Sequence, residues 1–220
     1  MMRARIVRFG WIVAIVLIAM SGAFAATTTS RSALGTSGVQ KSEVSLGDLV
    51  ADAIRASAGA NVAFVSASEL KESVTQISAG KVSTEDVTAY VAYTDDPIVV
   101  VKLTGRQIKQ ALERSVLIYP KNNLGFLQVS GLSFTFNPDG PQEGRLVSVN
   151  VGGSPISDSA AYSVAMTSSM ANGALGYWKI WTKNDIVNTT DVTIPKAIDQ
   201  FFTGNSSIDY SNLNRIKAGK

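Results

Sequence analysis

The spacing of apolar residues predicts that helices and strands alternate through the first half of the chain. Apolar side chains recur every three or four positions over residues 45–58, which is the pattern of an amphipathic helix. Ser45 and Asp48 have the spacing of a capping box at its start, and Gly59 suits its end. The apolar run at residues 62–65 predicts a short buried strand after this helix.

The next segments repeat this alternation. Ser83 with Asp86 resembles a second cap, for a short helix that carries Val87 inward. The β-branched run at residues 98–103 predicts a central strand, and Thr104 with Gln107 indicates a further helix after it.

From Phe126 onward the apolar period becomes two, which is typical of antiparallel strands. Residues 132–136 alternate, 138–140 form a turn signal, and 146–151 read as the returning strand. Residues 162–166 predict a further strand, and Pro195 suits the first turn of a final helix that Gly204 ends. The expected fold class is therefore α/β, of the mixed α+β kind with mixed sheets.

The N-terminus reads as an export signal. Three arginines precede an apolar stretch at residues 9–20, and an Ala-x-Ala site follows that ends at Ala25. As a helix, residues 9–25 reach only about 26 Å, at ~1.5 Å per residue, whereas a membrane-spanning anchor needs roughly 30 Å. We therefore expect a signal peptide over 1–25, cleaved after Ala25 into the periplasm or outside the cell. Residues 26–42, rich in Thr, Ser, Gly and Ala, are expected to be a flexible leader before a domain at 43–217.

Charge and composition exclude several function classes. Cleavage removes three of the 20 basic residues, so 17 remain against 17 acidic ones. A formally neutral chain gives no reason to expect binding to nucleic acid or, after signal cleavage, to a membrane. The chain has no histidine and no cysteine, so Ser-His-Asp catalysis, imidazole-held zinc and disulfides are all absent. No acidic cluster has metal-ligand spacing, and we expect neither a metal nor a cofactor.

Short matches in a fixed order resemble the substrate-binding C-terminal domain of secreted 5'-nucleotidases. They span roughly residues 41–217 and comprise Glu43, Leu46-Gly47, Asp52-Ala53, Leu103-Thr104-Gly105, Leu112-Glu113, Gln128 through Leu132, Arg145, Tyr162, Gly173, Gly176-Tyr177 and Arg215-Ile216. The resemblance implies a layered α/β/β/α domain. The catalytic partner domain of that family, a two-metal phosphoesterase, has no room in this chain.

The ligand-binding segments of that family are altered here. Its glycine loop, whose arginine faces the nucleotide phosphate, corresponds to residues 66–71, where Ser66 and Ser68 are compatible and Lys71 replaces the arginine beside Glu69. Of the two rings that clamp the base, Tyr93 remains and the other position is Ser169. The sugar-binding aspartate position is Leu175. The resemblance thus implies a weak ligand site composed of Tyr93, Lys71, Ser66, Ser68, Tyr177, Gly173 and Gly176.

Three other patterns have simpler explanations. Ser68-x-x-Lys71 matches the motif of penicillin-recognising acyl enzymes, but its companion motifs are missing. Trp178 and Trp181, close after Tyr177, either form an exposed recognition patch or cover the sheet edge or core, and we favour the second. Asp95-Asp96 reads as a solvated loop.

Three hypotheses remain for function, and none assigns a catalytic residue. The first is an exported, non-catalytic domain of the 5'-nucleotidase C-terminal type that binds a small molecule or a protein in a degenerate nucleotide cleft. The second is a specificity subunit that acts with a separate metallophosphoesterase chain, which supplies the metals. The third is a purely structural exported domain.

Overall fold

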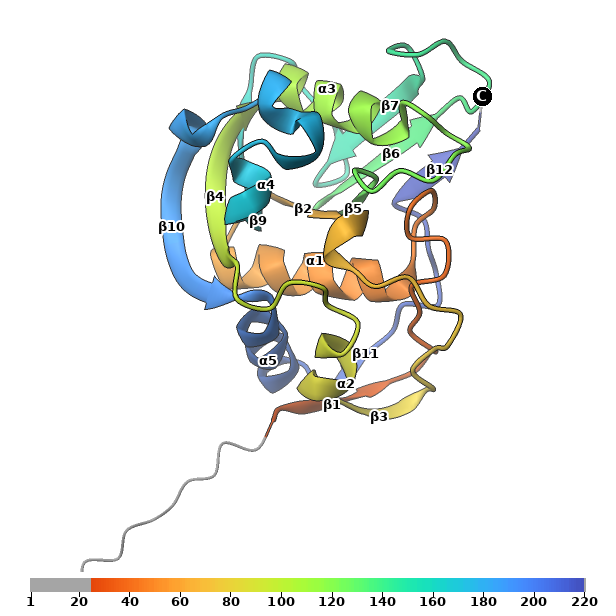
Figure 1. Ribbon diagram of the computed structural model, residues 1–220, viewed down its shortest axis with the longest axis vertical. Helices are drawn as coiled ribbons and strands as arrows, with labels where there is room; N and C mark the ends of the chain where they lie inside the picture. The colour runs from red at the N-terminus through yellow and green to blue at the C-terminus, as the bar shows by residue number, and fades with distance from the viewer. Residues whose placement is uncertain (1–24, 220) are drawn as a thin grey trace, which may run out of the picture.

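The structure, a computed structural model, describes residues 25–219 and contains three β-sheets with helices packed against them. Nearly all of the predicted signal peptide, residues 1–24, lies outside the described residues. Figure 1 shows the sheets and helices in one compact body, with strand β1 at one end and α3 near the other. The mixed α/β fold class expected from the sequence is confirmed.

The central sheet has five strands in the order β10-β4-β9-β2-β5. Their bounds are Ile186–Thr193, Pro97–Thr104, Ala161–Thr167, Val62–Ser66 and Leu127–Ser130. Strand β2 is buried along its whole length, as its continuous apolar run predicts. Helix α1 (Ser45–Ala58) crosses one face of this sheet and packs beside α5 (Ile194–Gly204) (Figure 1).

A second sheet contains the alternating segments of the second half of the sequence. Strands β6 (Leu132–Phe136) and β7 (Leu146–Val151) pair antiparallel, as predicted, and β8 (Ser154–Pro155) and β12 (Ile216–Ala218) extend the sheet at its two edges. Leu132, Phe134 and Phe136 are buried, so the period of two does mark the core face. Helix α3 (Gly105–Val116) contacts both β4 and β7 and connects the two sheets.

The expected flexible leader at 26–42 is wrong. Strand β1 (Thr27–Ser30) lies in a three-stranded sheet between β3 (Gly80–Ser83) and β11 (Ser207–Ile208). Leu34 and Val39 are fully buried in the core. A composition of small polar residues misled the prediction, because β1 is held by backbone pairing and by the Thr28 hydroxyl rather than by large apolar side chains.

The caps of the predicted helices are confirmed with one exception. Ser83 and Thr104 cap α2 (Thr84–Thr88) and α3 as expected, and Gly59 ends α1 with φ +59°. The predicted capping box of α1 is wrong, because Val44 is the N-cap residue and Asp48 is buried instead. The remaining helices are short: α4 (Ser168–Ala171) and the 3-10 turns η1 (Ala67–Glu69), η2 (Ala174–Lys179) and η3 (Lys183–Asp185).

Asp48 belongs to a buried ionic cluster that ties the C-terminal segment to α1. Arg215 donates from Nη1 and Nη2 to the two carboxylate oxygens of Asp52, each at 2.9 Å, and its Nε lies 3.4 Å from Asp48 Oδ2. The Glu43 carboxylate accepts the backbone N–H groups of residues 214–216. Burial raises the pKa of Asp48 to about 9; the Arg215 charge opposes this shift, and the nearby carboxylates of Glu43 and Asp52 add to it.

This shift predicts that the domain loses stability as pH rises. The folded state keeps the proton of Asp48 up to about pH 9, whereas the unfolded chain releases it near 3.8. Between these values the unfolded state binds fewer protons, so the free energy of unfolding falls with pH, by at most about 1.4 kcal/mol per unit from this group. Asp48→Asn, which mimics the protonated acid, is expected to flatten the decline in urea unfolding between pH 5 and 8. Asp158→Asn, at an exposed carboxyl whose pKa is lowered by Lys109, serves as the control and should leave the decline in place. An unchanged slope in Asp48→Asn would contradict the prediction.

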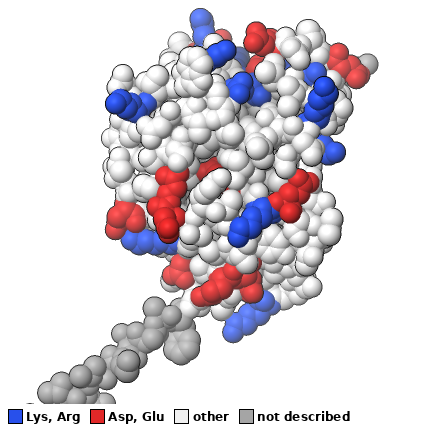
Figure 2. Space-filling view, viewed as in Figure 1, with Lys and Arg blue, Asp and Glu red and all other residues white. Residues whose placement is uncertain are grey.

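The face of the molecule shown in Figure 2 gives no sign of a basic interface. Figure 2 shows acidic and basic side chains scattered over one face of the described residues, without a continuous patch of either sign. Within residues 25–219, none of the helices is long and apolar enough to cross a membrane.

Candidate functional site

A cleft of about 670 Å³ lies where three strands of the central sheet meet a set of loops. Strands β2 and β9 are parallel neighbours, so their carboxyl ends, Ser66 and Thr167, reach the same edge of the sheet. Antiparallel β4 begins at this edge, preceded by the loop that carries Tyr93. Carboxyl ends of parallel strands are a common place for ligands in open α/β sheets. The lining is Ser66, Ser68, Glu69, Ala92, Tyr93, Thr94, Asp95, Asp96, Leu124, Thr167, Ser169, Met170, Ala174 and Leu175.

Glu69 lies at the buried end of this cleft. Its Oε2 accepts the Ser66 backbone N–H at 2.6 Å and the Ser66 hydroxyl at 2.9 Å, which closes a capping box around η1. Glu69 is 4% exposed; its Oε1 is buried and makes no hydrogen bond of normal geometry, although the Thr167 hydroxyl lies beside the carboxyl group. Burial raises the pKa of Glu69, an effect that the nearby Thr167 and Ser66 groups reduce and the Asp96 charge increases.

The outer wall of the cleft carries an aromatic ring and two more carboxylates. The Tyr93 side chain is 61% exposed and is therefore free to stack against a ligand. Asp96 accepts the backbone N–H of Ser169 through Oδ2 at 3.0 Å, which fixes the start of α4 beside the cleft. Asp95 also lines the cleft, so the Asp95-Asp96 pair is more than the solvated loop that the sequence suggested.

The opposite wall is formed by α4 and η2, at the positions where the resemblance implies a second ring and a sugar-binding aspartate. Ser169 and Leu175 occupy these positions and line the cleft. Leu175 has φ +58°, in the left-handed region that a leucine side chain disfavours. Its carbonyl oxygen accepts a hydrogen bond from Arg114 Nε at 2.8 Å, which helps to hold this backbone geometry.

Four of the seven residues predicted to bind a ligand do not line this cleft. Lys71 points elsewhere, because its Nζ donates to the Ala89 carbonyl oxygen at 3.0 Å. Tyr177 is fully buried and donates its hydroxyl to the Gly125 carbonyl oxygen at 2.6 Å, so it cannot contact a ligand. Gly173 and Gly176 have φ near +85° and leave room for the backbone of Trp178 and the guanidinium of Arg114. Their role is structural, and only Ser66, Ser68 and Tyr93 come together in the cleft.

The aromatic cluster after Gly176 divides between core and surface. Tyr177 stacks on Trp181 with ring centroids 4.7 Å apart, and Trp181 lies 6.2 Å from Phe64, so these rings form a stack in the core. Trp178 is 61% exposed. Trp181 therefore lies in the core, whereas Trp178 is largely exposed and is not part of it.

Serine nucleophile chemistry finds no support in the geometry. The Ser68 hydroxyl lies 2.8 Å from the Ser66 hydroxyl, and its nominal partner Lys71 is engaged by Ala89. Residues 25–219 contain no group of three or more acidic side chains placed to hold a metal. Among the described lining residues of the cleft, none of the side chains is arranged as a nucleophile with its base.

The residues at the buried end of the cleft were not predicted from the sequence. Ser66-x-x-Glu69 is itself a capping-box pattern, which could have identified Glu69 as part of an ordered turn. Thr167, Leu124 and Met170 carry no pattern of their own. They reach the cleft only because distant segments meet at this edge.

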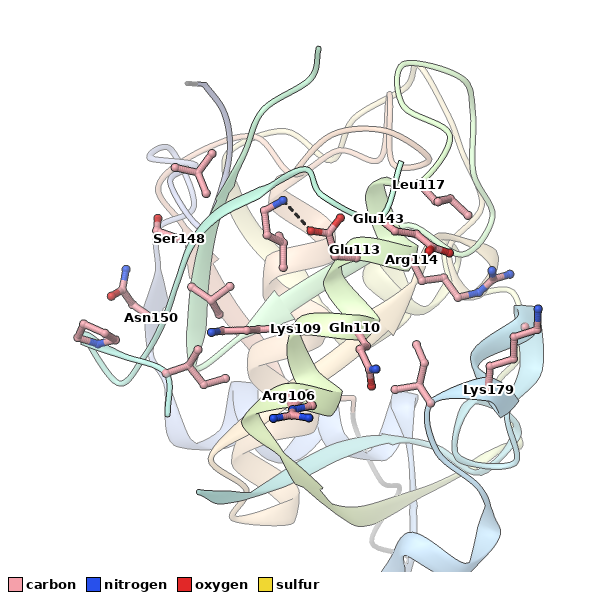
Figure 3. A pocket seen from close by; sticks show the side chains of 17 residues that line it. Arg106, Lys109, Gln110, Glu113, Arg114, Leu117, Glu143, Ser148, Asn150 and Lys179 are labelled. Atoms are coloured by element: carbon pink, nitrogen blue, oxygen red, sulfur yellow. Dashed lines mark hydrogen bonds between the residues drawn. The ribbon is translucent and has the colours of Figure 1, made fainter. Parts of the chain in front are cut away.

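A larger cavity, about 940 Å³, lies between α3, β7 and η2. Figure 3 shows Arg106, Lys109, Glu113 and Arg114 on α3, with Lys179 on the facing segment. Several of these charges serve the fold: Lys109 pairs with Asp158 at 2.7 Å, and Glu113 accepts the backbone N–H groups of Arg145 and Leu146. Because several of its charges serve such contacts and its lining includes only Gly176 of the predicted residues, we take the smaller cleft as the candidate site.

Comparison with known proteins supplies the relatives of this fold. The family model described as 5'-nucleotidase, C-terminal domain matches residues 23–182. The solved structure of a 5'-nucleotidase precursor from Thermus thermophilus superposes with a TM-score of 0.76 at 23% identity, covering 88% of this chain and 39% of that one. An NAD nucleotidase from Haemophilus influenzae gives 0.72 at 18%, covering 88% and 38%.

The name of a third similar structure describes a reaction other than nucleotide hydrolysis. A Thermus thermophilus sulfate thiohydrolase, solved in complex with glycerol, gives a TM-score of 0.63 at 19% identity, covering 87% of this chain and 34% of that one. A search of curated proteins found no match. This chain thus spans about two fifths or less of the length of these solved relatives.

Proposed function

Because the chain belongs to the 5'-nucleotidase C-terminal domain family, we propose that it is an exported, non-catalytic member that binds a small molecule in its altered cleft. The family relationship supports the presence of a ligand-binding edge on this fold. The absence of a nucleophile with its base, and of any acidic cluster placed for a metal in residues 25–219, supports a binding role without chemistry.

One observation carries this proposal: the cleft persists while the groups that the resemblance assigns to nucleotide binding do not. A volume of about 670 Å³ and the exposed Tyr93 ring remain. The second ring has become Ser169, the sugar-binding aspartate has become Leu175, and Lys71 lies outside the lining. A single base–aromatic stack is worth about 1–3 kcal/mol, which is too little to hold a nucleotide tightly by itself.

The proposal predicts that the purified protein releases no phosphate from AMP, with or without added Mg²⁺, Mn²⁺ or Zn²⁺. A phosphate-release assay on protein freed of contaminating phosphatases checks this. A ligand at ~100 times its Kd adds about 2.7 kcal/mol, so a true ligand of the cleft should raise Tm by roughly 5–10 °C for a domain of this size. Metal-dependent phosphate release that persists through successive purification steps would overturn the non-catalytic role.

A second candidate function rests on the length comparison. The alignments cover only 34–39% of the solved relatives named above, so most of each relative has no counterpart in this chain. A separate metallophosphoesterase chain could supply the rest, with this domain providing specificity. Recovery of AMP hydrolysis on mixing with such a chain, together with a stable complex of the two, would favour this candidate.

The contacts of Ala26 support export with cleavage after Ala25. The Ala26 backbone nitrogen donates to Asp199 Oδ1 at 2.9 Å, and its carbonyl oxygen accepts the Thr84 N–H at 3.0 Å. Cleavage after Ala25 would convert this amide nitrogen into an α-ammonium that already faces a carboxylate. The charge-assisted bond formed in this way would be stronger than the amide bond that it replaces.

A further inference from the structure

The charges of the cleft are opposite to those that a nucleotide needs. Three carboxyl groups line it, from Glu69, Asp95 and Asp96, and no lysine or arginine is among its described lining residues. A phosphate in this space would face like charge without a compensating cation, which disfavours it. The family resemblance does not lead to this result, since Lys71 by sequence alone keeps a positive charge at the phosphate position.

Glu69 adds a second and independent observation. The residue is 96% buried and lines the cleft; its Oε1 makes no hydrogen bond of normal geometry, although the Thr167 hydroxyl lies beside the carboxyl group and buried polar atoms are normally paired. An N–H donor from a ligand would satisfy this oxygen. A donor that carries a positive charge would also favour the ionised carboxylate over the protonated form that burial otherwise promotes.

Tyr93 supplies the third element that such a ligand would use. Its ring is exposed at the mouth of the cleft, and an aromatic face attracts an ammonium or guanidinium group as well as a flat ring. Asp95 and Asp96 lie in the same loop, two and three residues further on. The metal alternative is disfavoured, because the described acidic residues form no group spaced to hold an ion.

We propose that the cleft binds a small organic cation, in which an ammonium or guanidinium group reaches Glu69 and an adjoining flat or apolar part packs on Tyr93. This inference rests on the proposed binding role of the cleft and names the class of its ligand. It reverses the charge preference that the family resemblance implies.

Three probes of nearly the same size test the charge requirement. Tyramine carries an ammonium group, 4-ethylphenol is its neutral counterpart and 4-hydroxyphenylacetate is the anionic one. In calorimetric titrations we expect tyramine to bind with a Kd at least ~10-fold below that of 4-ethylphenol, and the anion to bind most weakly, as expected for a charge-assisted bond in a partly buried site. Agmatine and AMP extend the series to an aliphatic guanidinium and a nucleotide.

Substitutions in the cleft test which side chains cause the expected preference for a cationic ligand. Glu69→Gln keeps the shape of the side chain and should bring the tyramine to 4-ethylphenol ratio close to one. Because Glu69 also closes the η1 capping box, Asp95→Asn and Tyr93→Leu serve as second tests at positions that tolerate change, and each should weaken tyramine binding several-fold. Glu85→Gln removes one exposed negative charge outside the cleft lining and should leave binding unchanged.

The outcomes separate this inference from the proposed function. If neither tyramine nor agmatine binds more tightly than the neutral probe, or if AMP or the anionic probe binds best, the cationic class is wrong. Tight binding of AMP without hydrolysis would still leave the non-catalytic binding role in place. Phosphate release from AMP would overturn that role, whatever the amines do.

Discussion

Gly131→Ala is expected to destabilise the domain by about 3 kcal/mol or more, because a left-handed backbone and a backbone clash coincide there. Gly131 has φ +75°, and a Cβ at this position would lie 2.0 Å from the Asn61 carbonyl oxygen. Neither atom can move alone, since Gly131 joins β5 to β6 and Asn61 directly precedes β2. Thermal unfolding should show a Tm lowered by roughly 6–12 °C.

Gly152→Ala provides the matched control. Gly152 also has positive φ, at +58°, but a Cβ there would meet nothing within 4 Å. It should therefore carry only the conformational cost, about 1–2 kcal/mol. Equal losses in the two variants would show that the approach of Asn61 does not matter.

Arg215→Leu is expected to cost about 3–5 kcal/mol, because it leaves the partly buried Asp52 carboxylate without its cation and removes the guanidinium beside the buried Asp48. The Asp48 side chain is 2% exposed and Asp52 is 20% exposed, and Arg215 is the only Lys or Arg side chain that the structure, within residues 25–219, pairs with either of them. Arg215 Nη1 also donates to the Val129 carbonyl oxygen at 2.9 Å, so the variant also loses a hydrogen bond to strand β5 of the central sheet. Urea unfolding at pH 7 measures the loss.

Two further variants test whether the unpaired Asp52 carboxylate causes the loss of stability in Arg215→Leu. Adding Asp52→Asn to Arg215→Leu should recover part of the loss, because it removes the negative charge that the leucine leaves unpaired. Arg106→Leu makes the same substitution at an exposed position of α3 and should change stability by no more than ~0.5 kcal/mol. A loss below about 1 kcal/mol for Arg215→Leu would refute the role given to the cluster.

Local patterns predicted those elements of the fold whose signals are contained in a few neighbouring residues. The helix at 45–58, the strand at 62–65 and the hairpin of 132–136 with 146–151 all appear where the apolar period placed them. Strands β1, β10, β11 and β12 did not. They are short, polar or half-exposed, and depend on partners far away in the sequence.

The residues that carry the family resemblance prove to be mostly determinants of the fold. Gln128 accepts the Val44 N–H and donates to the Val39 and Ser42 carbonyl oxygens, which joins β5 to the start of α1. Arg145 donates to the carbonyl oxygens of Tyr119 and Pro138. Such residues identify the fold but say little about a ligand.

The candidate site was harder to predict for a different reason. A family motif places residues in order along the chain, but it does not say which side chains still face the cleft after substitution. Lys71 keeps the charge of the arginine position yet bonds to Ala89, and Tyr177 keeps the identity of a motif residue yet lies in the core. Only the folded arrangement shows that the remaining lining is acidic.

The pairing of β1 with β11 has a consequence for the order in which the chain can fold. Thr29 and Ser30 pair with Ser207 and Ile208, and the Thr28 hydroxyl donates to the Asn205 carbonyl oxygen across 177 positions of sequence. Strand β1 therefore stays without this neighbour until Ser207 and Ile208 have been synthesised. Pairing between such distant segments is a late step in folding, and loss of residues 206–220 should leave β1 unpaired on that side.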